Sequence, residues 1–260
     1  MEDDSYFEDG EFSTVKAILG LLTFSTIIPI NVFTSIEYMT RLTWVWPFIH
    51  LVVGLLAYLC GYISLNILHL NTFFTSVIIY AFLMIITGYN HLDGVMDMAD
   101  GVMVHGSSQR KIEVMKDSSV GSAAVATLFL VATLTVGGFY NILDYNFLAG
   151  IIICEALAKI SLITTALLSK PLKPGIGSYF IDAMNKTNYL TSTILMLIIS
   201  YFIAGYVGIL GGCGSILSGA IITYIAKRNF EFSNGDVLGM SNEVGRLVSL
   251  LFMAAGLFFL

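Results

Sequence analysis

Residues 44–68, WVWPFIHLVVGLLAYLCGYISLNIL, form a continuous apolar stretch without a single Asp, Glu, Lys or Arg. A run of roughly 17 to 25 apolar residues is long enough for a helix to cross the hydrocarbon core of a bilayer. Further predominantly apolar stretches lie at 72–90, 120–141, 146–168, 189–208, 210–226 and 244–260. The sequence therefore predicts an all-α polytopic membrane helix bundle of about seven transmembrane helices.

The overall composition supports this prediction. Of the 260 residues, 57% are hydrophobic and 12% are charged, whereas about 25% of the residues of a soluble domain are charged. The apolar run Ala17–Ile30 is short and contains Pro29, so it is predicted to be an interfacial helix rather than a span. We expect one integral membrane domain, residues 1–260, in contact with membrane lipid.

The N-terminal segment 1–12 is an acidic tail that supplies much of the net charge of −6. It has no basic region before the first apolar run, so it is not a secretory signal. The acidic balance argues against a nucleic-acid partner.

Lysine and arginine predict the orientation, because short cytoplasmic loops collect positive charge. All twelve of these residues except Lys159 fall on one side if the N-terminus is cytoplasmic. The cytoplasmic loops are then 91–119, 169–188 and 227–243. We therefore expect a multi-pass protein of the cell membrane whose functional face is cytoplasmic.

The segment His91–Gly121, HLDGVMDMADGVMVHGSSQRKIEVMKDSSVG, concentrates acidic residues. Asp93, Asp97 and Asp100 recur at i, i+4 and i+7, which places them on one stripe of a helix. Glu113 and Asp117 repeat the i, i+4 step. Like charges at this spacing repel unless cations lie between them, and hard oxygen ligands favour magnesium. The segment 91–119 is therefore the predicted catalytic segment.

Two other interpretations of the acidic residues remain open. They could belong to a solvated loop, or they could form a structural ion-pair network with Arg110, Lys111 and Lys116. His91, at the start of the acidic helix, could assist proton transfer or make a structural hydrogen bond.

The segment Asn234–Arg246, NGDVLGMSNEVGR, is a second polar cluster. Asp236 and Glu243 are seven residues apart and so share a helix face. Asp236 could instead cap a helix, and Glu243 could pair with Arg246 across one turn.

Within the stretch 146–168, Glu155 and Lys159 stand at i, i+4. Intramembrane charges are candidates for function, although a mutual ion pair would satisfy both residues equally well.

Carboxylates that bind metal beside basic loops fit phosphoryl transfer, because magnesium can neutralise a diphosphate and stabilise the leaving phosphate. The spacing from Asp97 to Gly101, followed by Glu113 to Asp117, is similar to the metal motif of CDP-alcohol phosphotransferases, which act on CDP-linked lipids. A cation transporter is a third possibility, but its carboxylates should lie near mid-bilayer in several helices.

A more specific resemblance is carried by G-x-x-HLDG-x-x-D-x-ADG at Gly88–Gly101, IEVMKDSSVG at Ile112–Gly121 and the Gly-Asp-x-Leu-Gly segment that begins at Gly235. Together with LGLLTFSTIIPI near the N-terminus, these segments resemble the cobalamin synthase family, the adenosylcobinamide-GDP ribazoletransferases.

The resemblance implies that adenosylcobinamide-GDP and α-ribazole, or its 5′-phosphate, are joined to give adenosylcobalamin, or its 5′-phosphate, and GMP. It also implies Mg²⁺ as the cofactor. Glu113 and Asp117 are then the candidate catalytic residues. The candidate metal ligands are Asp93, Asp97, Asp100 and Asp117. The candidate substrate-binding residues are His91, Arg110, Lys111, Lys116, Asp236 and Glu243.

Overall fold

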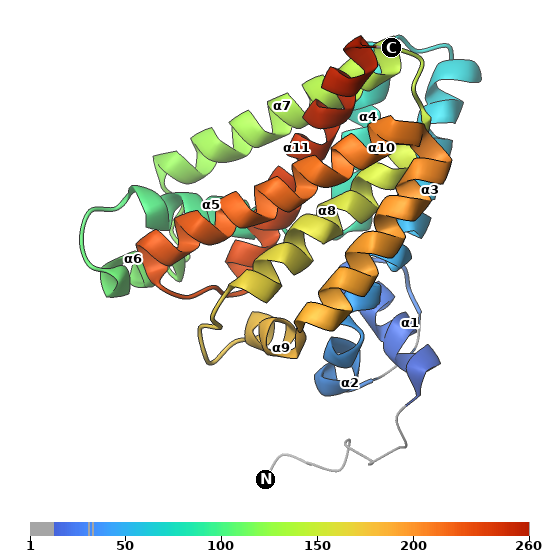
Figure 1. Cartoon of the computed structure of the whole chain (residues 1–260). Coiled ribbons are helices and arrows are strands. Elements are labelled where there is room, and N and C mark those ends of the chain that lie inside the picture. The colour runs from blue at the N-terminus through green and yellow to red at the C-terminus, as the bar shows by residue number, and fades with distance from the viewer. Residues whose placement is uncertain (1–12, 31, 33, 260) are drawn as a thin grey trace.

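The computed structural model describes residues 13–30, 32 and 34–259, and over these residues the chain folds as helices joined by short turns (Figure 1). The predicted acidic tail, 1–12, lies outside the described residues. The all-α prediction is confirmed. The elements are α1 (Thr14–Ser25), α2 (Ile36–Arg41), the 3-10 helix η1 (Thr43–Val45), α3 (Trp46–Asn66), α4 (Thr72–Ile86), α5 (Leu92–Met103), α6 (Ser108–Met115), α7 (Ser122–Asp144), α8 (Ala149–Leu168), α9 (Ile176–Ala183), α10 (Lys186–Phe230) and α11 (Gly235–Phe258).

Among the described residues, five helical segments are long and apolar enough to cross a membrane: η1 with α3, α7, α8, α10 and α11. Helix α8 is the centre of the bundle, because 83% of its most apolar stretch is buried, compared with 28% for α7. Large apolar side chains such as Phe129 and Phe202 remain exposed, as expected for an exterior that lipid covers. The chain is therefore a membrane protein.

Helix α10 is bent into two limbs that diverge in Figure 1. At Gly205 the backbone leaves the helical region, with φ 59° and ψ −151°, a conformation that glycine adopts readily. The sequence places the boundary between the two spans at 208–210, a few residues too late.

The predicted span 72–90 is also too long, because α4 ends at Ile86. Gly88 follows with φ +64°, and its N–H and that of Tyr89 donate to the carbonyls of Ile85 and Met84 at 2.9 and 3.0 Å. Backbone bonds of this kind close the C-terminus of a helix with a left-handed residue.

The predicted cytoplasmic loop 227–243 is wrong in extent. Helix α10 continues to Phe230 and α11 begins at Gly235, so the connection is a tight turn. The Asn234 side chain caps α11 by accepting a hydrogen bond from the Val237 N–H at 3.2 Å. The predicted loop 169–188 likewise contains a helix, α9.

The short helices α1, α2, α5, α6 and α9 gather at the end of the bundle opposite the C-terminus (Figure 1). We call this end the loop end. It brings together the acidic segment and the N-terminus of α11, because α5 packs against α11 and α7.

Candidate functional site

The acidic residues predicted to lie on one stripe do so on α5. Asp93 is exposed, whereas Asp97 and Asp100 are half-buried. The opposite side of α5 carries Val95 and Met98, which are fully buried. Packing of this apolar face therefore fixes the direction in which the carboxylates point.

Asp100 has a defined structural task. Its two carboxylate oxygens accept hydrogen bonds from the backbone N–H groups of Gly121 at 2.6 Å and Ala124 at 2.8 Å, in the first turn of α7. A carboxylate at this position is stabilised by the unpaired N–H groups and the dipole of the helix. A Cβ at residue 121 would lie 2.5 Å from the Asp100 Oδ1 and would displace this carboxylate.

Asp236 joins the α5 carboxylates from another helix. Gly94 of α5 packs directly against the Asp236 backbone, so closely that a Cβ at position 94 would collide with it. Asn234 donates a hydrogen bond of 2.6 Å to the Asp236 carboxylate. We call the four residues Asp93, Asp97, Asp100 and Asp236 the acid cluster.

The carboxylates of the acid cluster repel one another. Burial, and then repulsion from the Asp236 carboxylate and the other two acids, raises the pKa of Asp97 to about 6 from its ordinary 3.8. Among the described residues, no three His, Cys, Asp or Glu side chains converge closely enough to bind a metal ion without rearrangement. The donor set nevertheless fits a hard divalent cation, because it consists of mutually repelling carboxylates that a cation would stabilise.

The raised pKa of Asp97 predicts a pH dependence. The folded protein binds the Asp97 proton more tightly than the unfolded chain, so ionisation of Asp97 costs stability. The cost grows as the pH rises from about 3.8 to about 6 and is constant above that. In a chelator, we expect the unfolding temperature of the wild-type protein to fall more over this range than that of Asp97→Asn. The measurement is thermal unfolding of the two proteins in detergent. If their unfolding temperatures change identically with pH, the prediction is wrong.

The second pair of predicted acids does not share a helix face. Helix α6 ends at Met115, so Asp117 lies beyond it and the predicted i, i+4 geometry with Glu113 is wrong. The Ser119 backbone N–H donates to Asp117 at 2.9 Å and lowers its pKa. Asp117 and Asp100 line a common cavity of about 350 Å³. Glu113 is exposed and pairs with Arg110 at 3.3 Å.

The predicted cations of this segment differ in their surroundings. Lys111 donates to Asn229 at 2.6 Å and so ties α6 to the end of α10. Lys116 is exposed and acts electrostatically on Asp236. Of the three cations, Lys116 is therefore the one whose charge reaches the acid cluster.

Glu243 lies away from the acid cluster, although it shares a helix face with Asp236. It is 1% exposed and accepts a hydrogen bond from Arg246, as the i, i+3 spacing predicts. Arg246 also donates to Glu155 at 2.8 Å, and all three side chains are buried. We call Glu155, Glu243 and Arg246 the buried ionic network.

Lys159 makes contacts that its spacing from Glu155 does not predict. Its ammonium group donates to the Asn242 side chain at 2.8 Å and lies 2.8 Å from the His91 Nε2. Burial, and then the Lys159 charge, holds the pKa of His91 well below its ordinary value. His91 is therefore neutral at pH 7 and accepts this hydrogen bond, which leaves its proton on Nδ1.

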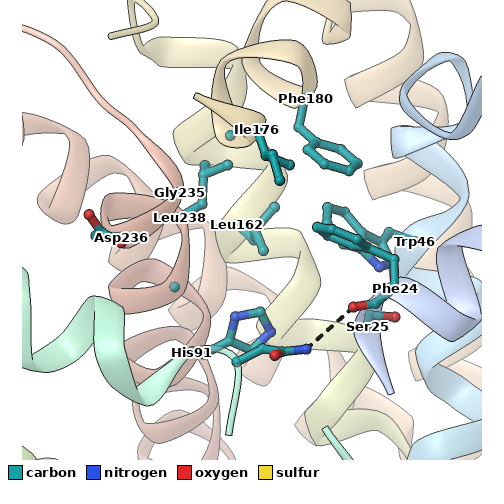
Figure 2. Close-up of a pocket in the computed structure, with 13 residues that line it drawn as sticks. Phe24, Ser25, Trp46, His91, Leu162, Ile176, Phe180, Gly235, Asp236 and Leu238 are labelled. Atoms are coloured by element: carbon teal, nitrogen blue, oxygen red, sulfur yellow. Dashed lines mark hydrogen bonds between the residues drawn. The ribbon is translucent and has the colours of Figure 1, made fainter. Parts of the chain in front are cut away.

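A cavity of about 270 Å³ adjoins the acid cluster (Figure 2). His91 and Asp236 line it together with apolar side chains from α1, α3, α8, α9 and α11. Its aromatic residues are Phe24, Trp46 and Phe180. Sequence reasoning missed all three, because they come from segments far apart in the chain and no local spacing marks them.

Comparison with known proteins gives a consistent result. A family model described as cobalamin-5-phosphate synthase matches residues 17–254. The chain is 31% identical over 243 residues to an adenosylcobinamide-GDP ribazoletransferase of Thermococcus kodakarensis, which covers 90% of this chain and 96% of that protein. The protein of the same name from Clostridioides difficile is 29% identical over 252 residues, 92% of this chain and 97% of that protein.

A similar protein from Methanosarcina mazei, also named adenosylcobinamide-GDP ribazoletransferase, is 28% identical over 253 residues and covers 90% of both chains. No solved structure matches the chain.

Proposed function

The chain belongs to the cobalamin-5-phosphate synthase family, and from this premise we propose that it is an adenosylcobinamide-GDP ribazoletransferase. It joins adenosylcobinamide-GDP to α-ribazole or α-ribazole 5′-phosphate. The products are adenosylcobalamin, or its 5′-phosphate, and GMP.

The observation that carries this proposal is the acid cluster at the loop end. Three carboxylates of α5 face a fourth on α11, and burial together with their mutual repulsion raises the pKa of Asp97. A diphosphate substrate is itself anionic, so it can approach these residues only if a cation lies between them. Carboxylates and diphosphate oxygens are the ligands that Mg²⁺ prefers.

In the proposed reaction, a hydroxyl oxygen of the α-ribazole ribose attacks the diphosphate phosphorus that is linked to cobinamide. The bond from this phosphorus to the bridging oxygen breaks, and GMP leaves with that oxygen. Asp93, Asp97, Asp100 and Asp236 would hold Mg²⁺, which would supply charge neutralisation for the diphosphate.

The remaining roles fall to residues beside the acid cluster. Asp117 receives the hydroxyl proton, since the Ser119 N–H keeps its carboxylate ionised and it shares a cavity with Asp100. Lys116 stabilises the negative charge of the diphosphate. Glu113 and Arg110 neutralise each other on the surface, and Glu243 belongs to the buried ionic network, so we assign none of these three residues a direct role.

We place the site on the cytoplasmic side of the cell membrane. The loop end holds the acid cluster, Lys116 and Lys111, and short cytoplasmic loops collect positive charge. Inverted membrane vesicles should therefore convert added substrates, whereas sealed right-side-out vesicles should not.

The test is to supply purified protein with adenosylcobinamide-GDP and α-ribazole 5′-phosphate and to measure GMP by chromatography. We expect release that requires Mg²⁺ and stops in excess chelator. Asp117→Asn should lower kcat by about 10²- to 10⁴-fold, the usual contribution of a general base.

The matched control is Asp144→Asn, which alters an exposed carboxylate at the opposite end of α7 and should leave turnover unchanged. CMP release from a CDP-linked lipid, without GMP release, would refute the proposal. Equal activity of Asp117→Asn and the wild type would refute the role of Asp117.

A further inference from the structure

One wall of the cavity beside the acid cluster is an aromatic stack. The rings of Trp46 and Phe180 are stacked, with centroids 4.8 Å apart and planes inclined by 24°. Phe24 adds a third ring, 5.2 Å from Phe180. Leu162, Ile176 and Leu238 line the same cavity. We propose that this cavity binds the flat aromatic base of α-ribazole, an assignment that rests on the proposed function.

The size of the cavity selects among the parts of the two substrates. At about 270 Å³ it lies just below the range of about 300–1,000 Å³ that is usual for ligand pockets. A bicyclic base such as dimethylbenzimidazole fits this space, but a corrin ring does not. Among the described residues, no Lys or Arg lines the cavity, which disfavours a diphosphate because a buried charge needs a partner.

The chemistry of the lining matches an aromatic base. Phe24 is 38% exposed and lines the cavity, so its ring offers surface to a ligand. Flat rings gain from stacking against other rings beyond the area that they bury.

The location of the cavity suits the reaction. Asp236 belongs both to the cavity lining and to the acid cluster, and Figure 2 shows its carboxylate pointing away from the aromatic wall. Base and carboxylate thus occupy two sides of the first turn of α11. Between them lies Gly235, where an added Cβ would meet no atom within 4 Å. The ribose, which separates the base from the reacting hydroxyl, fills this open space.

The first experiment measures binding without turnover. The chain has two tryptophans, Trp44 and Trp46, so Trp46 is the only tryptophan in Trp44→Phe. Titration of this variant in detergent with α-ribazole alone should give a saturable change of fluorescence. In Trp46→Phe, Trp44 should give no saturable change over the same concentrations. Equal responses of the two variants, or no response in either, would overturn the assignment.

The second experiment blocks the cavity. Ile176 is 56% exposed and lines the cavity, so Ile176→Trp fills space without disturbing the buried core. We expect KM for α-ribazole to rise by about tenfold or more, since loss of stacking and burial amounts to at least about 1.4 kcal/mol. KM for adenosylcobinamide-GDP should stay within about twofold of the wild-type value.

Ile221→Trp is the matched control, because Ile221 is exposed on α10 and lies outside the cavity lining. It should leave both KM values unchanged. Wild-type GMP release combined with an unchanged KM for α-ribazole in Ile176→Trp would overturn the cavity assignment alone. Absence of wild-type GMP release would overturn the proposed function and this assignment with it.

Discussion

Asp97→Asn should lower the rate of GMP release by about 10³-fold or more, because the variant loses a central ligand for the cation that neutralises the diphosphate. Asparagine has the same shape and removes a charge that the acid cluster disfavours. The variant should therefore fold as well as the wild type, or slightly better in a chelator. Loss of turnover would then report on chemistry rather than on misfolding.

A second measurement on this variant does not depend on turnover. Mg²⁺ should raise the unfolding temperature of the wild-type protein, since a ligand that binds only the folded state stabilises it. The rise should be lost or much reduced in Asp97→Asn and kept in Asp144→Asn. Full activity of Asp97→Asn, or an equal response of all three proteins to Mg²⁺, would exclude the acid cluster as the metal site.

Arg246→Met should prevent the protein from accumulating in the membrane. The substitution leaves the Glu155 and Glu243 carboxylates buried without their cation, and breaking a buried ion pair in this way costs about 3–5 kcal/mol. Total stabilities are only about 5–15 kcal/mol. We expect little folded protein by quantitative blotting and size-exclusion chromatography in detergent.

Two further variants test the cause of that loss. Lys173→Ala removes an exposed ion pair with Asp182, 2.6 Å long, and should cost no more than about 1 kcal/mol. Combining Arg246→Met with Glu155→Gln and Glu243→Gln removes all three charges and should restore much of the folded protein. Normal accumulation of Arg246→Met alone would show that the buried ionic network contributes little to stability.

The parts of the site that sequence could predict are those set by local periodicity. The i, i+4, i+7 spacing placed Asp93, Asp97 and Asp100 on one stripe, and the i, i+3 spacing paired Glu243 with Arg246. Both follow from the 3.6-residue repeat of a helix. Asp117 shows the limit of this reasoning, since the helix that would have aligned it with Glu113 ends two residues before it.

The parts that sequence could not predict depend on contacts between distant segments. The spacing of Glu155 and Lys159 suggested a mutual pair. In the structure, Glu155 instead pairs with Arg246 and Lys159 donates to Asn242, and both partners lie on α11. Periodicity also placed Asp236 and Glu243 on one face without giving their depth, so it did not indicate that Glu243 is buried in the bundle. Depth along a helix is decided by its neighbours.

The contact between Gly94 and the Asp236 backbone has a consequence for how the site can respond to its ligands. Backbone touches backbone there, so α5 and α11 cannot approach each other more closely at this point. Closer contact with a smaller ion must therefore come from rotation of the carboxylate side chains. The packing of the two main chains would then determine how well the site distinguishes Mg²⁺ from a larger divalent ion.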